Sequence, residues 1–504
     1  MALLSRGLLV IILGWSFVAT AEEKPNFLLI TVDDMSCDSV GAFGCKLAGT
    51  TPNIDELAAS GMKFLHAFVQ VGNCMPSRNV MWSGRYPHNN RVEGFYEIKD
   101  PGYPVLADLM KGAGYFSGIR GKVSHSTPYT PYPAWDAVLD TLADGSPVHL
   151  KDAKSYHHNT AEGIARAKAA GKPFCLNINI SDPHKPFFEE TKGPDPHVPS
   201  RVFSPDEVPV PGFLFEDAKV REELALYYSS VRRADDCFGE ILRALDESGE
   251  RDHTVILFLS DHGMPLPFAK TQLYFHSTRT PLIFVWPGVT KSGTADDEHL
   301  VSAVDFLPTL LDIAGISHPD GFDGRSFAGL LRGEKQEGRD HIIAEYNENA
   351  GGDRAPMRAI LTRDYGYLFN PWSNGERIMK TATQGTVTYR RMKALAPENE
   401  AVAARLDLFE HRVPEELYHY AKDPDAFVNL IGDGTHGAER DRLTGLLGEW
   451  MVRTKDPLLG VFQNRADPAA RESFMIATRA EADARKAEGK GGKKGQKKTK
   501  PTRE

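Results

Sequence analysis

Three short apolar runs along the chain end in acidic or histidine residues. Residues 27–32, 174–180 and 255–259 consist mainly of β-branched and other apolar side chains. Continuous apolar runs of this length predict strands buried on both faces, as in a parallel sheet. Ligands of open α/β sheets bind just beyond the carboxyl ends of the strands. We therefore expect a functional site at the point where these three strands end.

The residues that follow these runs are of types that hold a metal ion. Asp33 and Asp34 follow the first run, His184 follows the second, and Asp261 and His262 follow the third. A set made mostly of hard oxygen ligands suits Ca²⁺ or Mg²⁺ better than a metal that prefers thiolates. A single Asp at a strand end is more often a helix cap or a turn residue. Two adjacent Asp and an Asp-His pair favour the metal site.

A cysteine stands at the predicted start of a helix. Pro76 suits a first helical turn, because the N–H that proline lacks is unpaired there in any case. Arg78 lies four residues after Cys74, on the same face of that helix. Free backbone N–H groups and the helix dipole favour an anion at this position. The arrangement predicts a nucleophile and a guanidinium around a bound sulfate or phosphate; the alternative is a buried Cys beside a structural Arg.

Two further segments bear on the site. Apolar residues recur with helical spacing between about Arg221 and Leu245. Asp235 lies on the same stripe, and we interpret it as a buried structural acid. Residues 185–212 carry seven prolines and little periodicity. Such a long irregular segment beside His184 is either a lid over the substrate or a structural excursion of the surface.

Composition narrows the class of protein. The 504 residues are 41% hydrophobic and 10% aromatic, which suits a large domain with a smaller one and excludes a wholly disordered chain. Five cysteines exclude a disulfide framework. Cys37 and Cys45 are close enough in the sequence to pair, whereas Cys175 and Cys237 are expected to be buried thiols. The formal net charge of −9 argues against a dedicated nucleic-acid binder.

The two ends of the chain differ from the rest. Residues 1–21 are typical of a signal peptide: Arg6 precedes an apolar stretch too short to span a membrane, and residues 19–21 form an A-x-A cleavage site. An uncleaved anchor is the alternative. Residues 485–504 hold nine Lys or Arg and two Glu, and the Lys/Gly run from 490 onward is expected to be disordered. We predict an exported protein, periplasmic or secreted, with no nucleic-acid partner and no stable membrane insertion.

The segment CMPSR at 74–78, followed by SGR at 83–85, carries a resemblance to a known family. It resembles the signature C-x-P-S-R-x-x-x-L-T-G-R of type I, formylglycine-dependent sulfatases and departs from it at Trp82 and Ser83. The resemblance covers about residues 25–455. It implies the α/β fold of the alkaline-phosphatase-like sandwich, with a large mixed sheet flanked by helices and a smaller C-terminal α+β subdomain. It also implies that a separate formylglycine-generating enzyme oxidises Cys74 to formylglycine (3-oxoalanine).

The resemblance carries the family's metal ligands onto this chain. Asp33 and Asp34 match the first metal pair of sulfatases. Asp261 and His262 match the second pair, and Cys74 is the further ligand. The implied ion is a single Ca²⁺.

The resemblance also supplies candidate catalytic residues. Lys122 and His125 look like the family's G-K-x-H element with one extra residue, in the form found in iduronate sulfatases. His184 looks like the family's P-H histidine, and Lys270 lies where the family places a Lys or Arg against the sulfate. Residues 260–282 resemble heparan N-sulfatase (sulfamidase) in a proline pair, a tyrosine and the spacing. The sequence therefore lies between two branches, and the bond to be broken, N–S or O–S, stays open.

The implied mechanism gives each of these residues a role. One hydroxyl of the hydrated formylglycine at position 74 attacks sulfur, and Asp261 is the candidate base. Arg78 and Lys122 stabilise oxygens of residue 74 and of the sulfate. His184 or Lys270 assists the leaving group. His125 helps to expel the sulfate.

We predict a signal peptide at 1–21, a catalytic α/β domain at 22–340, a smaller subdomain at 341–465 and a helical or disordered basic tail at 466–504. The predicted function is a sulfatase that hydrolyses O-sulfate esters or N-sulfamates of sulfated sugars, such as glycosaminoglycans or other sulfated polysaccharides. Two alternatives stay open. One is a phosphoester or phosphonate hydrolase of the same superfamily, and the other is an inactive protein that binds sulfated glycans.

Overall fold

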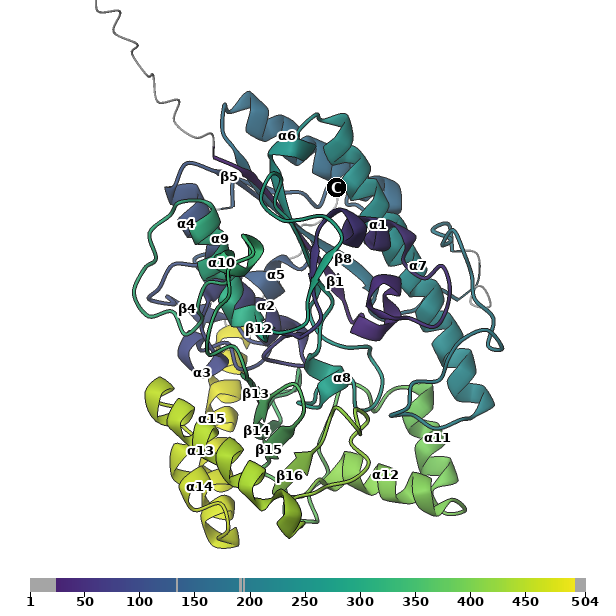
Figure 1. Cartoon of the computed structure of the whole chain (residues 1–504), viewed down its shortest axis with the longest axis vertical. Coiled ribbons are helices and arrows are strands. Elements are labelled where there is room, and N and C mark those ends of the chain that lie inside the picture. Colours follow the sequence, from purple (N-terminus) through teal and green to yellow (C-terminus); the bar gives the residue numbers. More distant parts are fainter. Residues whose placement is uncertain (1–23, 133–134, 190–192, 194, 495–504) are drawn as a thin grey trace, which may run out of the picture.

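The three predicted strands lie side by side in the middle of an eight-stranded sheet (Figure 1). The computed structural model describes residues 24–132, 135–189, 193 and 195–494. In it β1 (Asn26–Asp33) pairs in parallel with both β8 (Phe174–Pro183) and β9 (Thr254–Ser260). The sheet has the order β11-β2-β10-β9-β1-β8-β5-β7, and its remaining strands are β2 (Met62–Phe64), β5 (Phe116–Arg120), β7 (Ala137–Val138), β10 (Leu282–Val285) and β11 (Thr294–Asp296). Because β10 runs antiparallel to β9 and to β2, the sheet is mixed, as predicted.

Helices cover both faces of this sheet (Figure 1). Leu28 and Ile30 of β1 belong to one core, which includes side chains of α1 (Pro52–Ser60), α6 (Ala153–Ala169) and α7 (Ala218–Glu247). Phe27 and Leu29 belong to the core on the other face, with α2 (Cys74–Ser83), α4 (Leu106–Gly112), α9 (Phe306–Ile313) and α10 (Ala328–Leu331). Both faces of the central strands are buried, which explains why their sequences are apolar throughout. The prediction of an α/β sandwich is confirmed.

Asp235 is a structural acid, as predicted. It is fully buried on α7, the helix that was expected between about residues 221 and 245. Its carboxylate accepts hydrogen bonds from the backbone N–H groups of Asn53 (3.1 Å) and Ile54 (2.9 Å) in the first turn of α1. Burial raises the pKa of Asp235 to about 7. The side chain therefore joins two helices and caps α1.

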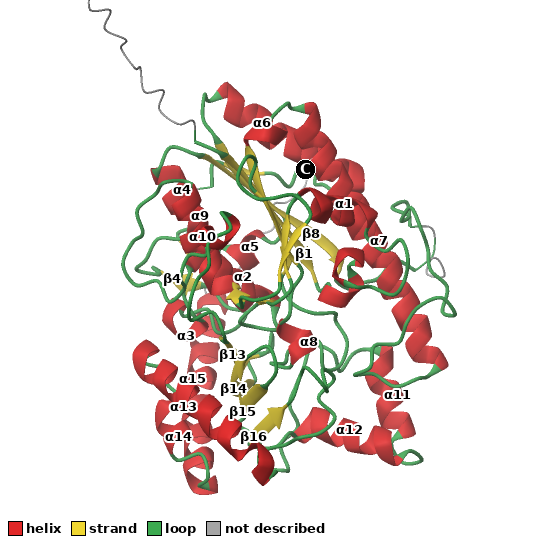
Figure 2. Cartoon of the chain, viewed as in Figure 1, coloured by secondary structure: helices red, strands yellow, loops and turns green. Residues whose placement is uncertain are grey.

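A small antiparallel sheet follows the large one in the chain (Figure 2). Its strands have the order β13-β14-β15-β16, with β13 (Ile342–Glu348), β14 (Arg354–Leu361), β15 (Gly366–Phe369) and β16 (Glu415–Tyr418). Its helices are α11 (Val387–Leu395), α12 (Glu400–His411), α13 (Gly437–Thr454), α14 (Leu459–Gln463) and α15 (Pro468–Lys494). This is the smaller C-terminal α+β unit that the resemblance implied. The last helix reaches Lys494, past the expected start of the low-complexity run, and residues 495–504 lie outside the described part of the chain.

Short elements complete the description. They are β3 (Ala67–Phe68), β4 (Ile98–Lys99), β6 (Tyr129–Thr130), β12 (Val301–Ser302), α3 (Pro87–Asn90), α5 (Val123–Ser126) and α8 (Phe275–Thr278). All five cysteines are free thiols, so the pairing of Cys37 with Cys45 that the sequence allowed is not formed. Cys175 and Cys237 are buried, as predicted. Among the described residues, no helix combines the length and apolar character needed to cross a bilayer; the predicted signal peptide lies outside them.

Candidate active site

Three strand ends bring the predicted site residues to one edge of the large sheet. The register pairs Asp33 of β1 with Pro183 of β8, and Val32 of β1 with Ser260 of β9. The acids and histidines that follow these positions therefore leave the sheet together. The described geometry of this edge is that of a polar site built on a rigid apolar scaffold.

Four side chains direct ligand atoms at one point. One donor atom each of Asp33, Asp34, Cys74 and His262 lies within 4.8 Å of the others, and all four residues are buried. The Nδ1 atom of His262 is 3.0 Å from the carbonyl oxygen of Gly263, so Nδ1 carries the proton and donates it there. The Nε2 atom then faces Asp34 Oδ1 at 3.2 Å and Cys74 Sγ at 3.3 Å. This tautomer leaves the Nε2 lone pair free for a cation.

The donor set fits a divalent cation. Asp33 is fully buried, and besides its ion pairs with Lys122 and Arg78 its carboxylate oxygens form no hydrogen bond with the described residues. A buried carboxylate in that condition is unfavourable unless a positive charge compensates it. Burial pushes the pKa of Asp33 up, but nearby positive charges, Lys122 foremost, outweigh burial and hold it well below its usual range. Ionised carboxylates with one imidazole suit a hard divalent ion such as Ca²⁺ or Mg²⁺.

Asp261 lies beside this group rather than within it. Its Oδ2 atom accepts a hydrogen bond from Arg78 Nε at 3.1 Å, and Arg78 Nη2 lies 2.9 Å away. Its Oδ1 atom accepts from the backbone N–H of Asp34 at 3.1 Å and is 3.8 Å from His262 Nε2. Burial raises the pKa of Asp261, and the negative charge of Asp33 adds to that effect. Asp261 thus connects the guanidinium to the ligand group and takes up a proton more readily than an ordinary Asp.

Cys74 occupies the first position of α2, and Arg78 reaches the same point from one turn later. Asn73, the residue before the helix, makes no side-chain cap, so the first N–H groups are not closed off by it. Burial raises the pKa of the Cys74 thiol well above its usual range. The fully buried Arg78 donates through Nη1 to Thr31 Oγ1 and to Asn179 Oδ1, both at 2.6 Å. The helix start therefore presents a neutral thiol and a firmly held guanidinium.

Two lysines flank the ligand group. Lys270 Nζ donates to both carboxylate oxygens of Asp34 at 2.7 Å and lies 3.9 Å from Cys74 Sγ. Lys122 forms an ion pair with Asp33. Burial lowers the pKa of each ammonium, but the neighbouring acids outweigh it, so both pKa values are raised. Both side chains remain cations beside the predicted sulfate position.

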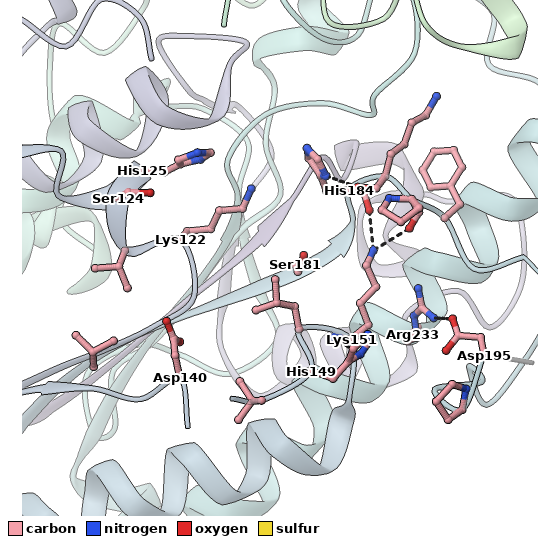
Figure 3. A pocket seen from close by; sticks show the side chains of 18 of the residues that line it. Lys122, Ser124, His125, Asp140, His149, Lys151, Ser181, His184, Asp195 and Arg233 are labelled. Atoms are coloured by element: carbon pink, nitrogen blue, oxygen red, sulfur yellow. Dashed lines mark hydrogen bonds and ion pairs between the residues drawn. The ribbon is translucent and has the colours of Figure 1, made fainter. Parts of the chain in front are cut away.

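The two predicted histidines stand at the wall of a cavity of about 1300 Å³ (Figure 3). His184 Nε2 lies 4.0 Å from Asp34 Oδ2, and its Nδ1 atom is 2.6 Å from the carbonyl oxygen of Lys185. His125, on α5, lines the same cavity near Lys122. Burial, with the charge of Lys122, lowers the pKa of His125 to about 4, so it is a neutral base near pH 7.

The first part of the proline-rich segment at 185–212 contributes residues to the wall of this cavity. Lys185, Pro186 and Phe187 line it next to His184, and Asp195 lines it farther along. The segment thus contacts the space in which a substrate would lie. Residues 190–192 and 194 of the segment lie outside the described part of the chain.

Sequence reasoning missed the residues that hold the site in place. Lys151 Nζ donates to Asp182 Oδ1 at 2.5 Å and to the carbonyl oxygen of His184 at 2.7 Å, and Arg233 Nε donates to Asp182 Oδ2 at 2.6 Å. Asn179 accepts from Arg78, as described above. The one available signal was a polar residue inside an otherwise apolar run, as at Asn179 in β8.

Comparison with known proteins identifies relatives along most of the chain. The sulfatase family profile matches residues 25–316, and the profile "N-sulphoglucosamine sulphohydrolase, C-terminal" matches residues 261–374. An ulvan-active sulfatase of Formosa agariphila is 27% identical over 445 residues, which cover 87% of this chain and 82% of that protein. Human N-sulphoglucosamine sulphohydrolase is 26% identical over 490 residues, covering 88% of this chain and 94% of the relative.

Solved structures share the fold. The phosphonate monoester hydrolase of Agrobacterium radiobacter superposes with a TM-score of 0.63 at 20% identity, covering 86% of this chain and 96% of that one. At that identity the likeness concerns the fold alone.

Proposed function

This chain belongs to the sulfatase family, and from that premise we propose that it removes sulfate groups, as O-sulfate esters or N-sulfamates, from sulfated sugars. The observation that carries the proposal is Cys74 at a buried helix start, with ligand atoms of Asp33, Asp34 and His262 within 4.8 Å. The named activities of the ulvan-active and N-sulphoglucosamine relatives support a saccharide substrate. The cavity beside this point is large enough for a sugar unit.

We propose one Ca²⁺ as the cofactor and formylglycine as the converted form of Cys74. The residues that would hold the ion are Asp33, Asp34 and His262 together with residue 74, whose Sγ atom stands in for an oxygen of the converted side chain. Asp261, which lies beside this group, would complete the set. When present, the two groups supply a neutralising charge for the sulfate and a hydrated aldehyde as the nucleophile.

The chain's own residues would then position the sulfate and move protons. Arg78 and Lys122 are cations beside the ligand group, paired with Asp261 and with Asp33, and are placed to stabilise oxygens of residue 74 and of the sulfate. Asp261 contacts Arg78 and Asp34, and its raised pKa suits a group that accepts the proton of the attacking hydroxyl.

The two histidines of the cavity wall and Lys270 would serve departure of the sugar and of the sulfate. His184, at the cavity wall, and Lys270, beside Asp34, are the two donors placed to protonate the leaving oxygen or nitrogen. His125 is neutral near pH 7 and so can accept the proton released when the second hydroxyl of residue 74 expels sulfate. A plain serine nucleophile would lack this exit.

We further propose that the protein is exported through the signal peptide at 1–21 and matured by a formylglycine-generating enzyme. Every residue of α2, from Cys74 to Ser83, is buried in the fold. A modifying enzyme must therefore reach Cys74 before α2 packs into the fold. We also propose that the catalytic domain ends at residue 340, that the smaller subdomain ends at residue 465, and that a basic tail follows.

The experiment is a comparison of substrates on protein co-expressed with a formylglycine-generating enzyme. Released sulfate is measured by ion chromatography from N-sulfoglucosamine, from O-sulfated glucosamine and from a 2-sulfated hexuronate. Phenyl phosphonate esters test the second candidate, a phosphoester or phosphonate hydrolase of the same superfamily. Sulfate release from at least one sugar, above phosphonate turnover, supports the proposal. Phosphonate turnover without sulfate release would overturn it, and glycan binding without turnover of either would indicate an inactive binder.

A further inference from the structure

The buried side-chain amide of Asn179 forms hydrogen bonds both with Arg78 and with the turn that carries Lys122. Asn179 lies on β8, is 1% exposed and stands opposite Thr31 in the register with β1. Its Oδ1 atom accepts hydrogen bonds from Arg78 Nη1 at 2.6 Å and from Thr31 Oγ1 at 2.7 Å. One side of the amide therefore fixes the guanidinium of Arg78.

The other side of the same amide fixes the turn that carries Lys122. The Nδ2 atom of Asn179 donates to the carbonyl oxygens of Arg120 and Gly121, both at 3.0 Å. Gly121 has a φ of +66°, and a Cβ there would lie 2.8 Å from the carbonyl oxygen of Asn179. Lys122 follows at a φ of 52°, and its ammonium pairs with Asp33. The turn is thus tight, pressed against β8 and held by the amide.

The orientation of the amide follows from its partners. Donors on Arg78 and Thr31 require the oxygen, and two carbonyl groups require the nitrogen. Both hydrogens of the amide and its oxygen are used, so no rotation of the side chain satisfies the site as well. Asn179 also lies on the strand that leads to His184.

We infer that Asn179 is a positioning residue that sets the distance between Arg78 and Lys122 and so shapes one binding site for the sulfate oxygens. The inference rests on the proposed function. Arg78 comes from α2 and Lys122 from the turn after β5, and the amide of β8 joins both through direct hydrogen bonds. Loss of the amide would let each cation move separately.

Asn177 provides a matched control on the same strand. It is fully buried two residues earlier, and neither polar atom of its side chain has a hydrogen-bond partner among the described residues. Asn179→Ala and Asn177→Ala remove the same atoms from the same layer of the protein. Loss of side-chain volume alone would make their effects similar.

The test measures sulfate release and sulfate binding in both variants. For Asn179→Ala we expect kcat to fall by about 10- to 100-fold with a smaller change in KM, the usual range for a residue that orients catalytic groups. We expect its affinity for inorganic sulfate, measured by calorimetry, to fall about tenfold, while Asn177→Ala keeps both values near wild type. In Arg78→Ala and Lys122→Ala backgrounds the additional effect of Asn179→Ala should shrink.

Two results would overturn the inference. One is an equal loss of kcat and sulfate affinity in Asn177→Ala and Asn179→Ala. The other is that Asn179→Ala lowers kcat by its full factor in both the Arg78→Ala and the Lys122→Ala background. If Asn179→Ala does not fold, Asn179→Asp replaces it in the same measurements. This variant keeps the side-chain volume and removes the hydrogen-bond donors to the turn. Sulfate binding needs no turnover, so a wild type that releases no sulfate defeats the proposed function while the binding comparison still decides the role of Asn179.

Discussion

The ammonium of Lys270 lies 2.7 Å from each carboxylate oxygen of Asp34, so a side chain from the segment after β9 rests on the carboxylate that follows β1. The same ammonium is 3.9 Å from Cys74 Sγ. Asp34 is therefore a member of the ligand group, whereas Lys270 contacts both Asp34 and the nucleophile position.

This relationship predicts that replacing Asp34 and replacing Lys270 have different effects on metal content and on kcat. Asp34→Ala should lose both the proposed calcium ion and activity, because the variant lacks one of the proposed ligands. Lys270→Ala should keep its calcium and lose about 10²- to 10³-fold in kcat, the usual loss when one donor to a developing charge is removed. Metal content by mass spectrometry and kcat on one sugar substrate check this. Loss of the metal from Lys270→Ala would contradict it.

Glu345→Gln is the matched control for metal content. Glu345 belongs to a second cluster of ligand types with His88 and Asp456. There Arg358 already supplies the cation, with Nη2 at 3.3 Å from Glu345 Oε1 and 3.1 Å from Asp456 Oδ1. The control variant should therefore retain the calcium of the wild type.

The cluster around His88 predicts a stability that falls in alkaline solution. Burial lowers the pKa of His88, but Glu345, with His88 Nδ1 at 2.7 Å from its Oε2, outweighs burial and raises that pKa to about 9. The raised pKa stabilises the fold fully below the unfolded value near 6.5, and this contribution is lost as pH rises toward about 9. We expect a loss of roughly 2–3 kcal/mol over that range. Urea unfolding at pH 6.5 and 9 measures it.

His88→Gln cannot titrate and serves as the comparison. Its free energy of unfolding should change less than that of the wild type between pH 6.5 and 9. Parallel pH profiles for the two proteins would show that His88 does not hold its proton through Glu345.

Lys151 is expected to act through the segment that carries His184. Its ammonium donates to Asp182 Oδ1, to the carbonyl oxygen of His184 and, at 3.0 Å, to that of Pro186. Lys151→Ala should lower kcat/KM by about 10- to 100-fold, because the orientation of His184 is lost. Lys154, exposed on the first turn of α6, is the matched lysine, and Lys154→Ala should behave as wild type. Equal activity of the two variants would show that Lys151 does not orient His184.

Asp235→Ala is expected to destabilise the protein without changing its chemistry. The variant loses the hydrogen bonds to Asn53 and Ile54 at the start of α1. The free energy of unfolding should fall by about 1–3 kcal/mol, as for loss of a buried cap. The kcat of the folded protein should stay within about twofold of wild type, since the hydrogen-bond partners of Asp235, Asn53 and Ile54, lie outside the site. A large fall in kcat would place Asp235 nearer the chemistry than the structure does.

The sequence predicted those parts of the fold and site that leave local patterns. Burial on both faces requires continuous apolar runs, so β1, β8 and β9 could be read directly, and Cys74 with Arg78 carried a family signature. The contacts of Asn179 with Thr31 and Arg78 join residues 148 and 101 positions apart, and nothing local marks them. The position of Asp261 against Arg78 likewise depends on packing of α2 on the sheet, which no short segment encodes.

The central claim is that residue 74 of the mature protein is formylglycine within this site. The most direct measurement is the mass of the peptide that holds residue 74, taken from protein co-expressed with a formylglycine-generating enzyme. Replacement of the thiol by an aldehyde predicts a mass about 18 Da lower, which no step of simple thiol oxidation produces. Unmodified cysteine at this position, in protein that nevertheless releases sulfate, would contradict the account.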